Sequence, residues 1–123
     1  MANPNLGSAS NIYGGCTFDA DIATTASAVL SNAASSGLLV KVNSLIISNI
    51  DGTNDADITV TVRDAAGSTT YSHLAKTISV PADATLVVIS KDTSIYLLED
   101  RAIYLAASAA GDLSATCSYE YMS

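Results

Sequence analysis

Residues 45–64, LIISNIDGTNDADITVTVRD, contain two apolar runs that flank a polar connection. In the second run, Ile58, Val60 and Val62 alternate with polar residues. An alternation at every second position predicts a β-strand with one face toward a core. The expected outward positions are Thr59, Thr61 and Arg63. The stretch therefore predicts two strands joined by a turn.

The run before the connection, LLVKVNSLII at 38–47, also alternates, but its phase shifts by one residue after Asn43. Val42 points inward before the shift and Leu45 points inward after it. One extra residue within a strand is what a β-bulge introduces. The sequence therefore predicts a single long strand that keeps the same face buried by means of a bulge.

Further short strands follow at spacings of about 8–12 residues, which is typical of all-β sandwiches. We expect them at 26–31, 70–80, 85–90, 94–98, 101–108 and 113–122. Pro81 interrupts pairing because proline has no backbone N–H to donate. About eight strands with one polar face each predict an all-β fold: a single antiparallel β-sandwich, jelly-roll-like, over residues 21–123. Residues 1–20 are expected to form an extended N-terminal arm, in which 12–18 could add a strand to its own sheet or to a neighbour's.

Composition narrows the class of protein. The chain of 123 residues is 49% hydrophobic and 14% charged, enough for one domain with a modest core. It has no apolar run long enough for a membrane span and no signal-peptide pattern at its start, so we expect a soluble product of the cytoplasm. The net charge is −7 and the five basic residues are scattered. Nucleic-acid binding needs grouped cations, so we expect no nucleic-acid partner and no membrane partner.

The two cysteines, Cys16 and Cys117, lie near opposite ends of the chain. Their spacing fits neither a zinc site nor a redox motif. In a cytoplasmic product we favour two reduced thiols in the core. A disulfide is the alternative, since strands from the two ends of a chain often meet in a sandwich.

Few residues could carry catalysis. His73 is the only histidine, and its surroundings, YSHLAK, contain no nucleophile motif. Glu99 and Asp100 could form a carboxylate pair, but they fall in an expected turn, where carboxylates are usually solvated. The segment YGGC at 13–16 lacks the lysine and the helix that a phosphate-binding loop requires. We therefore expect no catalytic residues and no cofactor.

The polar connection carries Asp51, Asp55 and Asp57, whose oxygens are the ligands that calcium prefers. The spacing departs from that of an EF-hand loop, because Gly52 follows the first aspartate at once and no glutamate closes the loop. We favour a polar turn without a metal, and an ion site is the alternative.

Four segments carry a resemblance to a known class of proteins: SNIDGTNDADITV (48–60), KTISVPADATLVVISKD (76–92), IYLLEDRAIYLAASAAGDL (95–113) and SYEYMS (118–123). Through them, roughly residues 38–123 resemble small virion structural proteins of tailed bacteriophages, especially those of marine and cyanobacterial phages. The N-terminal third matches no pattern of this class. The resemblance brings no catalytic residues with it.

The resemblance implies a non-enzymatic component of the virion, foremost a capsid cement (decoration) protein. Such a protein would bind the major capsid protein across capsomer joints and stabilise the shell. A homo-oligomer is then expected, with a trimer where three capsomers meet. The alternatives are another virion protein of the neck, tail or baseplate, a fibre-attachment module, or a receptor- or carbohydrate-binding module.

Overall fold

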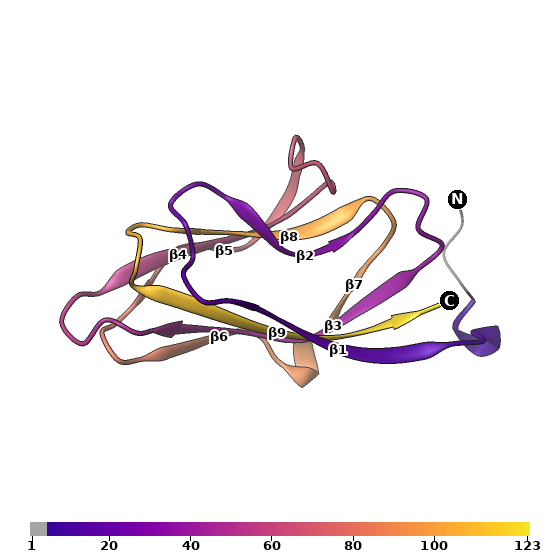
Figure 1. Cartoon of the computed structure of the whole chain (residues 1–123), viewed down its shortest axis with the longest axis horizontal. Coiled ribbons are helices and arrows are strands. Elements are labelled where there is room, and N and C mark those ends of the chain that lie inside the picture. Colours follow the sequence, from indigo (N-terminus) through magenta and orange to yellow (C-terminus); the bar gives the residue numbers. More distant parts are fainter. Residues whose placement is uncertain (1–4) are drawn as a thin grey trace.

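A computed structural model describes residues 5–123, which form nine antiparallel strands in two packed sheets (Figure 1). One sheet, called sheet A here, has the order β1 (Ile12–Asp19), β9 (Leu113–Met122), β3 (Leu39–Asn49) and β6 (Thr85–Ile89). The short β7 (Ile95–Leu97) also pairs with β3 in sheet A. The other, sheet B, has the order β2 (Ser27–Asn32), β8 (Arg101–Ala107), β4 (Ala56–Arg63) and β5 (Thr70–Val80).

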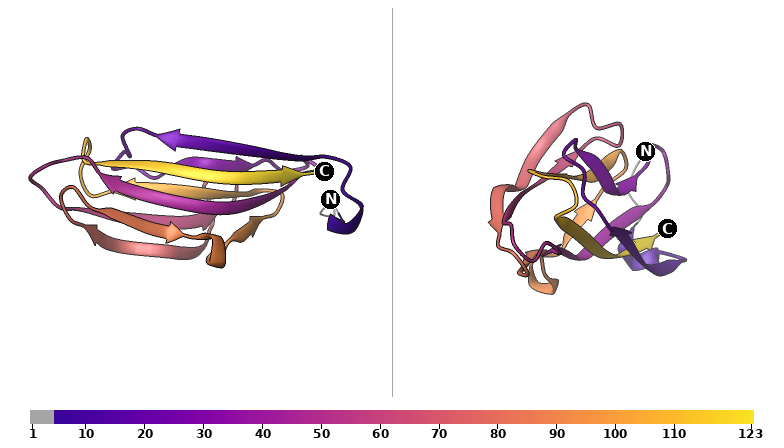
Figure 2. Two further views of the ribbon diagram at one scale, coloured as in Figure 1. Left: turned by 90° about the horizontal axis from the view of Figure 1, so that it is seen from below. Right: turned by 60° about the vertical axis from the view of Figure 1, so that its left-hand side comes forward.

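The topology is that of a jelly roll, and the predicted β-sandwich is confirmed. The chain crosses between the sheets after β1, β2, β3, β5, β7 and β8, so most neighbours within a sheet are far apart in sequence. Figure 2 shows β1 beside β9, with β3 on the other side of β9. The two ends of the chain therefore meet in sheet A.

The core lies between the sheets and includes residues that the alternation predicted, although Val62 is only half-buried at its margin. Ile58 and Val60 of β4 are fully buried, as are Leu45 and Ile47 of β3. The register of β3 against β9 shifts between Val42 and Ser44, which confirms the predicted bulge. The Asn43 side chain donates a hydrogen bond to Oε1 of Glu120 at 2.9 Å, so the extra residue has a partner outside the core.

One position departs from the predicted pattern. Thr61 of β4 has the outward phase but is only 2% exposed. Its hydroxyl accepts a hydrogen bond from Nε of Arg63 at 2.9 Å, and Tyr104 lies opposite it on β8. The side chains of Arg63 and Tyr104 cover Thr61, so this position on the outer face of sheet B is shielded from solvent.

The arm expected at residues 1–20 is shorter in the structure. Residues 12–19 form β1, which pairs with β9 over its full length, so this part of the expected arm belongs to the sandwich. Of the remainder, residues 1–4 lie outside the described residues. The segment from Asn5 contains the short 3-10 turn η1 (Leu6–Ser8), in which no residue is buried, and it projects beyond the end of sheet A (Figure 1).

Two buried asparagines fasten connections to strands. The Asn49 amide group donates to the carbonyls of Asn54 and Val80 at 2.9 and 2.8 Å, and its oxygen accepts from the Asp51 N–H. Asn32 likewise donates to the carbonyls of Leu38 and Leu97. A buried amide whose donors and acceptor are satisfied fixes the segments that it joins.

A second 3-10 turn, η2 (Lys91–Thr93), connects β6 to β7. Within residues 5–123, no helix is long and apolar enough to cross a membrane.

Replacing Val60 with aspartate should prevent folding. Val60 is 0% exposed between the sheets, and an unpaired buried carboxylate costs several kcal/mol, about as much as the total stability of a small domain. Soluble yield and circular dichroism measure the effect. The matched control is Thr59→Asp on the outer face of the same strand, which should fold. Equal yields of the two variants would contradict the assigned strand phase.

Candidate functional site: an exposed edge strand and an acidic end

His73 lies on β5, opposite Thr61 of β4, and its side chain is exposed. Among the hydrogen bonds of residues 5–123, none involves the His73 side chain, so no serine, cysteine or carboxylate is aligned with it. Nucleophilic catalysis requires such an alignment. The histidine expected at the surface or half-buried is thus found at the surface.

The carboxylates of Glu99 and Asp100 do not converge. Asp100 has a left-handed backbone conformation, with φ of 59°, in the turn between β7 and β8. Its Oδ1 accepts a hydrogen bond from the Ala65 N–H at 3.2 Å, which ties this turn to the β4–β5 connection. Glu99 is half-buried, and its Oε1 is enclosed without a hydrogen-bond partner among the described residues. The pair lies in the predicted turn, and Asp100 has a structural use there.

The aspartates of the opening stretch also serve local structure. Oδ1 of Asp51 accepts from both the N–H and the hydroxyl of Thr53 at 2.9 Å, and Oδ2 accepts from the Asn54 amide at 2.9 Å. These donors hold the pKa of Asp51 far below its ordinary value. Oδ1 of Asp55 accepts from the Ala82 N–H at 3.0 Å, across in the next connection. These hydrogen bonds are those of a polar turn, the structure that the sequence favoured for this connection.

The three aspartates of this connection are not gathered around one point. Over residues 5–123, no group of three or more histidine, cysteine, aspartate or glutamate side chains is placed to hold a metal ion. The backbone N–H of Asp57 donates a hydrogen bond to the hydroxyl of Ser108 at 2.8 Å. The carboxylate of Asp57 does not form such a group with those of Asp51 and Asp55.

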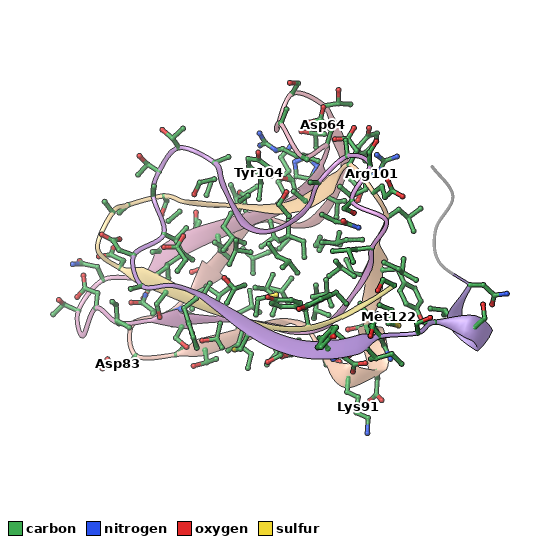
Figure 3. All side chains as sticks on the ribbon, turned by 45° about the vertical axis from the view of Figure 1, so that its right-hand side comes forward. Asp64, Asp83, Lys91, Arg101, Tyr104 and Met122 are labelled. Carbon is green, nitrogen blue, oxygen red and sulfur yellow. The ribbon has the colours of Figure 1, made fainter. Side chains whose placement is uncertain are left out.

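Negative charge collects at the end of the sandwich where β1, β3, β5 and β8 end. Asp83 is labelled at this end in Figure 3. We call this the acidic end; its members are Asp19, Asp21, Asp51, Asp55, Asp57, Asp83 and Asp112. The remaining five acidic residues equal the five lysines and arginines in number, so the net charge of −7 is that of the acidic end. The rest of the sandwich, including the opposite end, carries equal numbers of acidic and basic residues and is neutral overall.

Within the acidic end, Asp112 is the residue with an unfavourable environment. Its half-burial raises the pKa of its carboxyl, and the charges of Asp51 and Asp21 raise it further. Asp21 has a donor of its own, because its Oδ1 accepts from the Gly111 N–H at 2.7 Å. Asp112 is thus a carboxylate held close to two others.

The cysteines occupy different environments, and the expectation of two core thiols is correct for only one of them. Cys117 is buried on the inner face of β9, and this burial raises the pKa of its thiol to about 12. Cys16 is exposed on β1. It lies opposite Ser118, whose hydroxyl contacts its sulfur at 3.8 Å, whereas Cys117 lies opposite Thr17. Since neighbouring residues of a strand point to opposite faces, the two thiols lie on opposite faces of sheet A and are free.

A cavity of about 290 Å³ opens between β2 and the inner face of sheet A. Its walls are mainly apolar and include Leu30, Val40 and the rings of Tyr119 and Tyr121. Tyr121 also stacks on Tyr13, with ring centroids 5.2 Å apart. The tyrosines at the end of β9 thus line the rim of the core.

β1 presents apolar side chains to solvent. Phe18, Ile12 and Tyr13 are 70%, 60% and 52% exposed. Ile12, Cys16 and Phe18 share the outer face of sheet A, and Val87 on β6 adds an exposed apolar residue at the opposite side of that face. An exposed apolar surface on a strand at a sheet edge is typical of a protein–protein contact. The sequence had placed these residues in an arm that could add a strand to its own sheet or to a neighbour's, and the strand belongs to its own sheet.

No protein-family model matches the sequence, and no curated protein matches it. Among solved structures, the chain is similar to one described in the words "Bacillus endospore appendages form a novel family of disulfide-linked pili". The two share 13% sequence identity with a TM-score of 0.56, over 100% of this chain and 96% of that one. At this identity the likeness concerns the fold, and it extends over the whole sandwich.

Gly15 should be sensitive to substitution and Gly14 should not. A Cβ on Gly15 would lie 2.5 Å from the Tyr119 ring, whereas one on Gly14 would meet no atom within 4 Å. Overpacking costs about 1–3 kcal/mol, so Gly15→Ala should lower the free energy of unfolding by that amount. Gly14→Ala should leave it unchanged or raise it by about 0.5–1 kcal/mol. Urea unfolding measures both.

The cause can be checked in a Tyr119→Ala background, where Gly15→Ala should cost little because the ring is gone. An undiminished cost in that background would show that the ring contact is not the reason.

Asp112→Asn should raise the melting temperature at pH 7. A carboxyl whose pKa is higher in the folded than in the unfolded chain opposes folding when it is ionised, and this penalty disappears once the pH falls below the unfolded value of about 3.9. Asp51→Asn should have the opposite effect at pH 7, because the lowered pKa of Asp51 reports hydrogen bonds that favour its charged form. Thermal melts from pH 7 to pH 3 test both signs. A melting temperature for Asp112→Asn below that of the unaltered chain at pH 7 would contradict the assignment.

Proposed function

We propose that this chain is a non-enzymatic structural subunit that acts by binding other protein subunits. In the specific form that we propose, it is a capsid cement protein of a tailed bacteriophage and binds the major capsid protein across capsomer joints. The observation that carries the proposal is the exposed apolar strand β1 at the edge of sheet A, with Phe18 70% exposed.

The use of the ionisable residues supports a structural role. Asp51, Asp55 and Asp100 each accept hydrogen bonds that fix a connection between strands. His73 stands alone on the surface of β5. Catalysis requires groups that converge on a reacting atom, and these groups are distributed over separate turns and strands.

The phage assignment rests on the resemblance of the strand-and-turn segments between residues 38 and 123. Those segments form β3 to β9, which make up most of both sheets. A sandwich of this kind supports a shell by adding contacts between subunits, and whatever binds only the assembled state stabilises it by mass action. The edge of sheet A and its outer face supply a surface for such contacts.

A second candidate is a subunit of a protein filament. The observation that favours it is the likeness in fold to the chain from the disulfide-linked pili, which covers the whole of this chain. Both candidates use a rigid jelly roll as a building block. They differ in whether the assembly consists of this chain alone or needs another protein as its partner.

Electron cryomicroscopy of purified phage particles that contain this chain tests the cement role. We expect density for the 12.5 kDa jelly roll at the joints between capsomers, in many copies per shell. Density in a few copies at the neck or tail would preserve the structural role and contradict the cement position. Absence from the particle would overturn the phage assignment.

The purified protein alone should be imaged in parallel over a range of concentrations. Long filaments formed without any other protein would favour the second candidate. Discrete small particles would favour the first.

A further inference from the structure

The four main edges of the two sheets differ in how well they are protected against pairing with another chain. The β2 edge has only six residues, with a register shift against β8, and the β6 edge has only five residues. The β5 edge has three register shifts against β4, a lysine at position 76 and a left-handed residue, Thr77, with φ of 46°. Short, irregular and charged edges are how natural sheets discourage further pairing.

β1 has none of these features. It pairs with β9 through eight residues without a register shift, and from Ile12 to Phe18 it contains neither a charged residue nor a proline. It is therefore an open edge: regular, uncharged and flanked by exposed apolar side chains.

The register identifies which backbone groups of β1 are free. Asn11 and Ser123 exchange two backbone hydrogen bonds, at 3.2 and 3.0 Å, just beyond the paired residues of β1 and β9. In an antiparallel ladder, such hydrogen-bonded pairs alternate with pairs that do not exchange bonds. Residues 13, 15, 17 and 19 therefore bond to β9. Residues 12, 14, 16 and 18 direct their N–H and C=O groups to the open side.

We propose that the open edge of β1 binds the β1 strand of a second copy, antiparallel about a two-fold axis, so that sheet A continues from one protomer into the other. Residues 12, 14, 16 and 18 of each copy would then pair with residues 18, 16, 14 and 12 of its partner. This register gives about eight backbone hydrogen bonds, two for each of the four pairs. It is the register with the largest overlap of free groups.

The side chains agree with this register. On the outer face, Phe18 of each copy lies opposite Ile12 of the other, so the two-fold axis creates two such pairs. Both residues are largely exposed in the single chain. An aromatic residue opposite a β-branched residue is a favourable cross-strand pair. Gly15 faces its counterpart at the axis, where no side chain obstructs the approach.

The charge distribution selects the antiparallel orientation. β1 runs from the neutral end of the sandwich to the acidic end, where Asp19 terminates it. Parallel pairing would bring two acidic ends side by side. Antiparallel pairing separates them by roughly the length of eight residues, about 26 Å, several times the screening length of about 8 Å at physiological salt. A second copy is therefore a partner without like-charge contacts along the strand.

This inference rests on the proposed function in one respect, the view that β1 is an assembly surface. Sedimentation velocity of the reduced, purified protein over a range of concentrations tests it without any particle. We expect the mass to double from the 12.5 kDa of the single chain. Gly14→Pro should weaken this dimerisation by about tenfold or more, because it removes a free donor and places a ring at the interface while leaving the bonds to β9.

Gly14→Ala is the matched control, since it keeps the N–H and its Cβ meets no atom within 4 Å. It should dimerise like the unaltered chain. Circular dichroism melts show whether both variants are folded, and a folded Gly14→Pro variant that dimerises normally would overturn the proposal. A chain that stays monomeric at every concentration would also overturn it, but would leave the particle-binding role to the cryomicroscopy test.

The orientation is tested by cross-linking in a Cys16→Ser background. Ile12→Cys and Phe18→Cys are purified separately and then treated with a short bismaleimide, alone and mixed. Only the mixture should give strong covalent dimers, because residue 12 lies opposite residue 18 of the partner in the proposed register. Equally strong cross-linking within either variant alone would indicate parallel pairing and overturn the proposed arrangement.

Discussion

The sandwich depends on β3 being paired along both of its sides. β9 runs along one side over almost the whole strand, and β6 and β7 share the other. A strand in this position must keep one face toward the core over eleven residues. The bulge at Asn43 allows this. Val42 and Leu45 are three positions apart and would point to opposite faces of a regular strand, yet both are fully buried.

Side chains fix several of the connections between strands. Asn49 reaches the carbonyl of Val80 and Asn32 that of Leu97, so each fixes a strand end to a segment far away in sequence. Asp55 and Asp100 do the same from the surface, accepting from Ala82 and Ala65. Polar residues that suggest chemistry when read in sequence therefore mostly serve the jelly roll itself. What remains for recognition is the surface of the sheets.

Local alternation predicted the strands and their faces where one sheet face is buried throughout. This applies to Ile58 and Val60, and to Val42 and Leu45, because a period of two leaves one arrangement that buries them. It failed where a partner from elsewhere in the chain decides the environment. Thr61 is buried under Arg63 and Tyr104, and Cys16 is exposed because its pairing with Ser118 places it on the outer face of sheet A.

The candidate surface was harder to predict than the fold. The apolar residues of β1 are few, so in sequence they resemble an arm that cannot bury itself, and only pairing with β9 makes them an ordered, exposed strand. The acidic end has a similar origin. Its aspartates belong to separate connections, and the jelly-roll topology gathers them at one end.

The position of β9 also governs when this chain can fold. β9 follows the other eight described strands in the sequence, yet it lies between β1 and β3, which come early in the order. Until residues 113–122 have left the ribosome, β1 lacks its partner and β3 lacks one of its two neighbours. Long-range pairing of this kind is slow and leaves apolar strands exposed in the meantime. Sheet A is therefore completed only once residues 113–122 are available, and a chain that stops before Leu113 has no continuous sheet A to form.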